Sequence, residues 1–311
     1  MSLFATGGPA SGGHWTTRLR RAVPPTPAPS ASGGETSFSW VHALPLLLSA
    51  AAAVLVAPSG LRALPARENF RGRSLPCPGG VVIVAAALLA LVPLTALAEL
   101  GNADILEPEL GRIALYVLGV ALLGLVDDLL AGPARGWRGH GGALLGGELS
   151  TGVLKAVGAV ALAGLTLSGR GLSDARWLLG VLVLALATNL LNLLDLRPGR
   201  AAKALVLLGA GLLVGTRDLD APWALGLFLG PALVLGALDV RERVLLGDTG
   251  ANLLGALAGL WLVLTLGTAG LAVALALLAL VTVYGELRSL SEWIEKTPVV
   301  RQLDLIGRPS A

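Results

Sequence analysis

The sequence has few of the residues that build disulfides and transition-metal sites. It contains one cysteine, Cys77, which excludes an internal disulfide and a cysteine-based metal cluster. Its three histidines, His14, His42 and His140, are too few and too scattered for a zinc site. A disulfide-stabilised fold and a zinc-dependent one are therefore both excluded.

Charge is also scarce. Only 14% of the residues are charged, against about a quarter in a soluble domain, and the mean hydropathy is +0.76. Between short charged clusters lie apolar runs of about 17 to 22 residues, the length that a helix needs to cross a bilayer. Runs such as Val81–Ala98 are continuous and lack the alternation of a membrane β-strand. The sequence therefore predicts an all-α, polytopic membrane helix bundle.

The composition divides the chain into three parts. Residues 1–38, rich in Gly, Ser and Pro, are predicted as a disordered tail, and residues 39–287 as a transmembrane domain. Residues 288–311 are predicted as a cytoplasmic amphipathic tail that Pro298 divides into two pieces and that lies on the membrane or on the bundle. Within the transmembrane domain we expect about nine transmembrane helices. They run roughly over 39–57, 78–99, 111–130, 150–168, 174–191, 202–216, 221–238, 250–266 and 269–285.

The basic residues follow every second predicted span. Connections after the odd-numbered spans are rich in arginine, whereas the others are short or acidic. The positive-inside rule therefore places the odd-numbered connections in the cytoplasm, with the N-terminus outside and the C-terminus inside. The expected location is the plasma (inner) membrane of a bacterium, crossed many times. The net charge of +3 reflects this topology and not nucleic-acid binding.

Four polar clusters fall on the predicted cytoplasmic side. The first runs from Arg67 through Arg71 to Arg73 and is followed by Gly79 and Gly80. Its arginines are suited to phosphate, and paired glycines let a backbone approach a ligand closely. The alternative is a positive-inside loop that leads into a helix.

The second cluster is the pair Asp127-Asp128 at the end of an apolar span. Ionised carboxylates near the hydrocarbon boundary are costly, so the pair should have a partner, either Mg²⁺ or a cationic side chain. Lys155, inside the next span, is a candidate for that cation, although it could instead extend to the interface. The alternative for the pair is a simple helix-end marker.

The third cluster is Asn189, Asn192 and Asp195, whose spacing places them on adjacent turns of one helix flank. We interpret them as a ligand-binding wall, with polar helix–helix contacts as the alternative. The fourth is Gly247-Asp248-Thr249-Gly250, which opens a span. A helix start of this kind suits phosphate, and its carboxylate suits the accompanying metal; the alternative is an N-cap.

These clusters, in this order and spacing, resemble the polyprenyl-phosphate N-acetylhexosamine-1-phosphate transferases, known as glycosyltransferase family 4. The resemblance covers about residues 60 to 265 and rests on Gly79-Gly80, Asp127-Asp128, Lys155, the N-x-x-N-x-x-D motif and the G-D-x-G motif. It implies Mg²⁺-dependent transfer of a sugar 1-phosphate from a UDP-sugar to a membrane polyprenyl phosphate, with release of UMP. Such enzymes make lipid intermediates of peptidoglycan and other cell-envelope glycans.

The resemblance also implies roles for the matched residues. Asp127, Asp128 and Asp248 would be catalytic, with Asp248 and Asp127 as Mg²⁺ ligands. The substrate-binding residues would be Arg71, Gly79, Gly80, Lys155, Asn189, Asn192 and Asp195. The chain departs from the family where Pro198 replaces a second aspartate, and it has no histidine after His140 and no tenth span. These departures predict altered donor recognition.

Two other functions remain open. A transporter could use Asp127, Asp128 and Lys155 as an intramembrane relay. A non-catalytic relative could bind polyprenyl phosphate or an assembly partner. The expected partners of the enzyme are a polyprenyl phosphate and a nucleotide-sugar donor, with a homodimer as one option and no nucleic acid.

Overall fold

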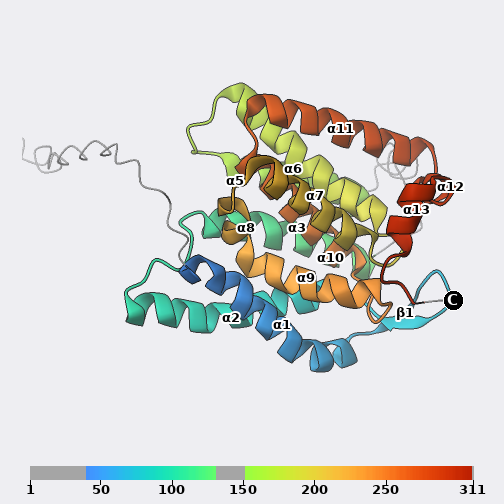
Figure 1. Ribbon diagram of the computed structural model, residues 1–311, viewed down its shortest axis with the longest axis horizontal. Coiled ribbons are helices and arrows are strands. Elements are labelled where there is room, and N and C mark those ends of the chain that lie inside the picture. Colours follow the sequence, from blue (N-terminus) through green and yellow to red (C-terminus); the bar gives the residue numbers. More distant parts are fainter. Residues whose placement is uncertain (1–39, 131–150, 310–311) are drawn as a thin grey trace, which may run out of the picture. The chain divides into compact units, whose positions relative to one another are not determined.

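The computed structural model describes residues 40–130 and 151–309. The predicted disordered tail and the basic connection Arg135–Arg138 lie outside these ranges. The described chain is almost wholly helical (Figure 1). Its elements are a 3₁₀ turn Trp40–Ala43, α1 Leu44–Ala63, β1 Ala66–Glu68, β2 Ser74–Pro76, α2 Gly80–Gly101, α3 Leu110–Leu130, α5 Thr151–Leu167, α6 Asp174–Leu194, α7 Arg200–Thr216, α8 Asp220–Ala224, α9 Gly226–Val240, α10 Gly247–Thr265, α11 Thr268–Leu287, α12 Leu290–Lys296 and α13 Pro298–Leu305.

Six of the described helices are long and apolar enough to cross a membrane, namely α1 (with the turn before it), α2, α3, α6, α10 and α11. A helix stands at each of the nine predicted positions, but α5, α7 and α9 have only 17, 17 and 15 residues. The predicted all-α fold is therefore confirmed, and six of its described helices have the length and composition of membrane spans; the predicted count of nine spans is not confirmed.

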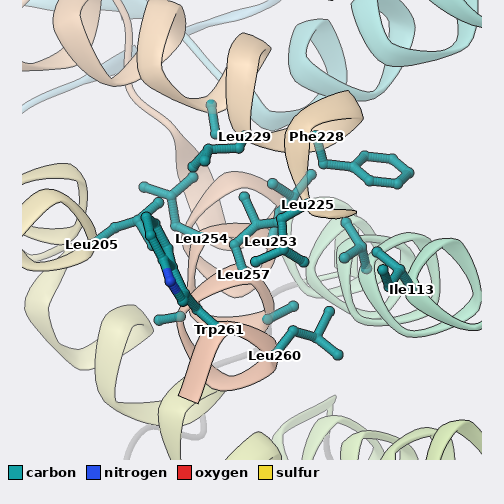
Figure 2. Packing of buried hydrophobic residues seen from close by; sticks show 14 of the residues in the cluster. Ile113, Leu205, Leu225, Phe228, Leu229, Leu253, Leu254, Leu257, Leu260 and Trp261 are labelled. Carbon is teal, nitrogen blue, oxygen red and sulfur yellow. The ribbon is translucent and has the colours of Figure 1, made fainter. Parts of the chain in front are cut away.

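Helix α10 occupies the centre of the bundle and packs against α6, α3 and α7. In the most apolar 18-residue stretch of α10, 83% of the residues are buried, against 11% in the corresponding stretch of α11. Figure 2 shows Leu254 and Trp261 of α10 beside Leu205 of α7, and Leu253 close to Leu225 at the start of α9. The central helix can therefore carry polar residues at its start without exposing them to lipid.

Small residues bring α10 close to α6. A Cβ at Gly255 would lie 2.5 Å from the Cα of Thr188, and one at Gly259 would lie 3.1 Å from the Cα of Leu184. Two glycines four residues apart form a small-residue face that lets membrane helices pack backbone to backbone. This close packing sets α6, which carries the third polar cluster, directly beside α10.

The connections between helices gather at two ends of the bundle. At one end, the segment before α2 pairs with the segment before α10, since Leu245 N–H donates to Pro76 O (2.9 Å) and Gly79 N–H to Leu245 O (2.8 Å). At the other end, Arg112 donates to Ser168 O (2.8 Å) and Arg176 to Leu266 O (3.1 Å). The predicted sorting of connections into two classes is confirmed for those described. Which end faces the cytoplasm stays a prediction.

The C-terminal segment forms two short helices, α12 and α13. Pro298 begins the second helix, which confirms the predicted division, and Ser289 caps the first by accepting from Glu292 N–H (3.2 Å). The two helices and the residues to Arg308, which we call the C-terminal hairpin, contact the start of α7 through an ion pair between Arg200 and Asp304. The segment therefore lies on the bundle, one of the two surfaces expected for it.

Candidate functional site

The start of α10 is held by a carboxylate from another helix. Asp128, near the end of α3, accepts hydrogen bonds from Asp248 N–H (3.1 Å), Thr249 N–H (2.9 Å) and the Thr249 hydroxyl (2.8 Å). A negative group at the positive end of a helix dipole is stabilising. Gly124 permits this approach, since a Cβ there would lie 2.4 Å from Asp248 O. Asp128 therefore fixes the position of Asp248, and Asp248 itself does not cap the helix.

Lys155 joins two of the predicted catalytic carboxylates. Its ammonium group lies 3.0 Å from Asp127 Oδ2 and 2.5 Å from Asp248 Oδ2. The expected pairing of Lys155 with the Asp127-Asp128 pair is thus confirmed. Asn192, in the amide orientation that satisfies both its ends, donates to Asp248 Oδ1 (3.2 Å) and accepts from Lys155 (3.3 Å). Four residues from α3, α5, α6 and α10 therefore form one connected polar cluster.

A cavity of about 270 Å³ opens beside Asp248. Its walls come from β1 and the loop after it, from the last turns of α3 and α9, from the residues that follow β2 and α6, and from the start of α10. We call it the acidic cavity, because the carboxylates of Asp128, Asp195, Asp239 and Asp248 all line it. The other lining residues are Arg67, Glu68, Asn69, Phe70, Cys77, Leu196, Arg197, Pro198, Leu245 and Gly247.

Asp195 is the carboxylate in this cavity with the least compensation. Within the described residues its side chain has no hydrogen-bond or ion-pair partner. Burial raises the pKa of Asp195 well above its usual value, and the negative charges of Asp239, Asp248 and Asp128 raise it further. Crowded carboxylates of this kind attract either protons or a cation. The cavity is therefore suited to a cation that arrives with an anionic ligand.

Asp239 was not among the predicted site residues. It lies near the end of α9, only 1% exposed, and accepts a hydrogen bond from Gly199 N–H (2.7 Å). Gly199 has φ +79°, a conformation that favours glycine, and a Cβ there would strike Val240. The signal in the sequence is an aspartate at the end of an otherwise apolar helix.

The mouth of the cavity carries an aromatic ring between arginines. Phe70, in the loop that joins β1 to β2, is 45% exposed, and the guanidinium of Arg197 lies 4.9 Å from its ring centre. Arg71 lies 5.3 Å from the same ring and pairs with buried Glu242 (3.4 Å). Arg67 pairs with Asp128 (3.5 Å) and lines the cavity itself. Of the arginines in the first polar cluster, Arg67 therefore lines the cavity, whereas Arg71 packs against the Phe70 ring.

Seven of the ten predicted site residues do not line the cavity. Asp127, Lys155 and Asn192 belong instead to the polar cluster around Asp248, whereas Arg71, Gly79, Gly80 and Asn189 belong to neither. Gly79 and Gly80 pack against the segment that opens α10, where a Cβ at Gly80 would lie 2.2 Å from Gly250 N. Their close backbone approach is therefore to the protein itself. Asn189 lies one turn before Asn192 on α6 and contributes no wall of the cavity.

The donor set can be tested against the Mg²⁺ that the resemblance implies. No group of three or more Asp, Glu, His or Cys residues in the described ranges is placed to hold a metal by itself. Mg²⁺ in phosphate-handling sites usually takes one or two carboxylates and completes its shell with water and phosphate oxygens. Asp248 lines the cavity and shares Lys155 with Asp127, so these two carboxylates meet that requirement. The residues present therefore fit a Mg²⁺ that is bound together with a phosphate ligand.

Comparisons with known proteins give no family assignment. No model of a protein family matches the chain, and no curated protein matches it. The interpretation of the site therefore rests on its geometry and chemistry.

Proposed function

We propose that this protein transfers a sugar 1-phosphate from a UDP-sugar to a membrane polyprenyl phosphate, with Mg²⁺, and releases UMP. The observation that carries the proposal is the cluster of Asp127, Lys155 and Asp248, whose member Asp248 lines the acidic cavity at one end of the bundle. A water-soluble nucleotide sugar and a lipid phosphate meet at such an end. We place this end on the cytoplasmic face of a bacterial plasma membrane, on the charge asymmetry of the connections.

Asp248 is the principal Mg²⁺ ligand in this proposal, with Asp127 as the second carboxylate. The bound ion would neutralise charge on the diphosphate of the donor. Asp128 holds the start of α10, so that the Asp248 carboxylate stays at the cavity wall. Lys155 keeps Asp127 and Asp248 close together, because a cation between two carboxylates offsets their repulsion.

The acceptor needs orientation more than activation. A phosphomonoester has a second pKa near ~6, so most of a polyprenyl phosphate is already dianionic at about pH 7. A strong general base is then unnecessary, and alignment with charge neutralisation supplies most of the rate. Arg67 at the cavity and Lys155 beside it are the cations that would meet the two phosphate groups.

The donor site is formed by the mouth of the cavity. Phe70 and Arg197 offer a flat, cationic surface on which a planar nucleobase could stack. Pro198 stands beside them, where the family that this chain resembles has an aspartate. We therefore assign base recognition to stacking on Phe70 in place of a carboxylate contact.

The two rival functions are less well supported. A transporter needs a polar path to both faces, and the polar cluster described here opens on one end only, with apolar Leu253, Leu254 and Leu257 on the next turns of α10. A non-catalytic relative would bind lipid but would not need Asp127 and Asp248 held together by a half-buried lysine.

The decisive experiment supplies the purified protein with polyprenyl phosphate, Mg²⁺ and a panel of UDP-sugars, and measures UMP. We expect UMP with at least one donor and none from Asp248→Asn. Asp218→Asn, at the opposite end of the bundle, is the matched control and should retain the activity. Lipid binding without UMP from any donor would establish the non-catalytic alternative.

A further inference from the structure

A second cluster of charges lies behind the acidic cavity. Arg200, Asp304 and Arg308 are 4%, 8% and 3% exposed. Both oxygens of Asp304 accept from Arg200 (3.0 and 3.0 Å) and from Arg308 (2.7 and 3.0 Å), while Lys203 donates to its carbonyl oxygen (2.5 Å). We call these four residues the C-terminal network. Buried charges are tolerated only when they are paired and hydrogen-bonded as fully as this.

The network holds one wall of the acidic cavity. The loop Leu196–Gly199 lies between the cavity and the C-terminal hairpin, and three of its residues are tied to the hairpin or to α9. Arg308 donates to Pro198 O (3.0 Å), Arg197 pairs with Glu295 of α12 (2.5 Å), and Gly199 N–H donates to Asp239. The loop has no regular structure of its own, so these contacts decide where Arg197 and Pro198 stand.

A tight turn places the end of the hairpin against α9. Leu303 and Ile306, 41% and 62% exposed, line an apolar cavity of about 290 Å³ together with residues of α7 and α9. Gly307 adopts φ +76°, and a Cβ there would lie 2.8 Å from a Val240 methyl group, so the chain turns tightly against α9. Because α9 also carries Asp239, the hairpin is seated on the helix that forms the opposite wall of the cavity.

We propose that the C-terminal hairpin is a positioning element for the donor site, in which Asp304 and Glu295 act on the cavity through Arg200, Arg308 and Arg197. Neither residue touches the cavity itself. Glu295 orients the Arg197 guanidinium over Phe70, and Asp304 anchors the backbone of Pro198 by way of Arg308. This inference rests on the proposed function for its kinetic consequences but not for its structural ones.

The kinetic test compares Glu295→Gln and Asp304→Asn with Glu292→Gln. Glu292 lies on the same helix as Glu295 but pairs only with exposed Lys296. We expect the KM for the nucleotide sugar to rise about 5- to 10-fold in the first two variants, with kcat within about twofold, as for lost ground-state binding. Glu292→Gln should leave both constants unchanged. An unchanged KM in Glu295→Gln would overturn the proposal, and this surface substitution keeps the test valid if Asp304→Asn fails to fold.

A second readout does not require activity. Cys77 is the only cysteine of the chain, lines the acidic cavity and is 4% exposed, so its alkylation by iodoacetamide reports how well the cavity is closed. We expect labelling to accelerate about 3-fold or more in Glu295→Gln and Asp304→Asn, and not in Glu292→Gln. Faster labelling in a protein that makes no UMP would reject the proposed function and retain the hairpin's role. Unchanged labelling in both variants would likewise reject that role.

Discussion

The acidic cavity and the C-terminal network are two buried charge clusters of opposite construction. Five acidic residues, Glu68 among them, line the cavity, and Asp195 has no partner among the described residues. In the network three cations surround the single carboxylate of Asp304, which accepts four hydrogen bonds. A cluster that is fully paired stabilises a fold, whereas one with excess charge and open space is prepared for a ligand. We therefore assign ligand binding to the acidic cavity and a structural role to the C-terminal network.

The largest expected effect follows from neutralising the central carboxylate of the cavity. Asp248→Asn removes the principal metal ligand and should lower turnover by on the order of 10³-fold or more. Asp127→Asn should cost less, because Asp127 is held by Lys155 and is the second ligand. UMP release at saturating Mg²⁺ measures both. Equal and complete loss in the two variants would show that Asp127 does more than we assign to it.

A substitution of Lys155 should change turnover and Mg²⁺ affinity in opposite directions. Lys155→Gln removes the cation between Asp127 and Asp248, so the site becomes more negative. We expect turnover to fall about 100-fold while the affinity for Mg²⁺ rises, because the carboxylates lose a competing cation. Calorimetric titration with Mg²⁺ checks the second effect, with Lys296→Gln as the exposed control. A parallel fall in metal affinity would contradict the assigned role.

The C-terminal network should respond in stability and not in metal binding. Arg200→Leu leaves Asp304 with Arg308 alone and should lower the free energy of unfolding by about 2 kcal/mol, less than the loss of a whole buried pair. Thermal unfolding in detergent measures this change, and Mg²⁺ affinity should stay as in the parent protein. A changed metal affinity with unchanged stability would reverse our assignment of the two clusters.

The C-terminal network also makes the stability of the fold depend on pH. Burial alone would raise the pKa of Asp304, but the hydrogen bonds and charge of Arg200 and the charge of Arg308 outweigh it and hold this pKa below its usual range. A carboxyl with a depressed pKa in the folded state contributes stability above its unfolded pKa of about 4. That contribution is lost as the pH falls through the folded pKa. Asp304→Asn should therefore flatten the acid limb of the unfolding curve.

The sequence predicted more about the helices than about how they meet. Apolar length alone located the nine helices, and the cost of an unpaired membrane charge predicted the partner of Lys155. The bond from Asp128 to the start of α10 could not be predicted, because it depends on which helices are neighbours. Amphipathicity likewise left the C-terminal segment on either membrane or bundle, and only the Arg200–Asp304 contact decides between them. Asp239 was not predicted as a site residue, because a single acidic residue at the end of an apolar helix is what the membrane boundary of a span also looks like.

The smallest expected effect concerns Cys77 and the filling of the cavity. Burial, followed by the negative charge of Asp128, raises the pKa of the Cys77 thiol to about 11. Since the thiolate is the reactive form, alkylation should be slow at about pH 8 and should accelerate about tenfold per pH unit up to that pKa. A UDP-sugar with Mg²⁺ should slow the labelling by about two- to fivefold, because the ligand occupies the space beside Cys77. Protection that persists in Asp248→Asn would mean that the donor binds without the metal. It would contradict our proposal that Asp248 holds Mg²⁺ for donor binding.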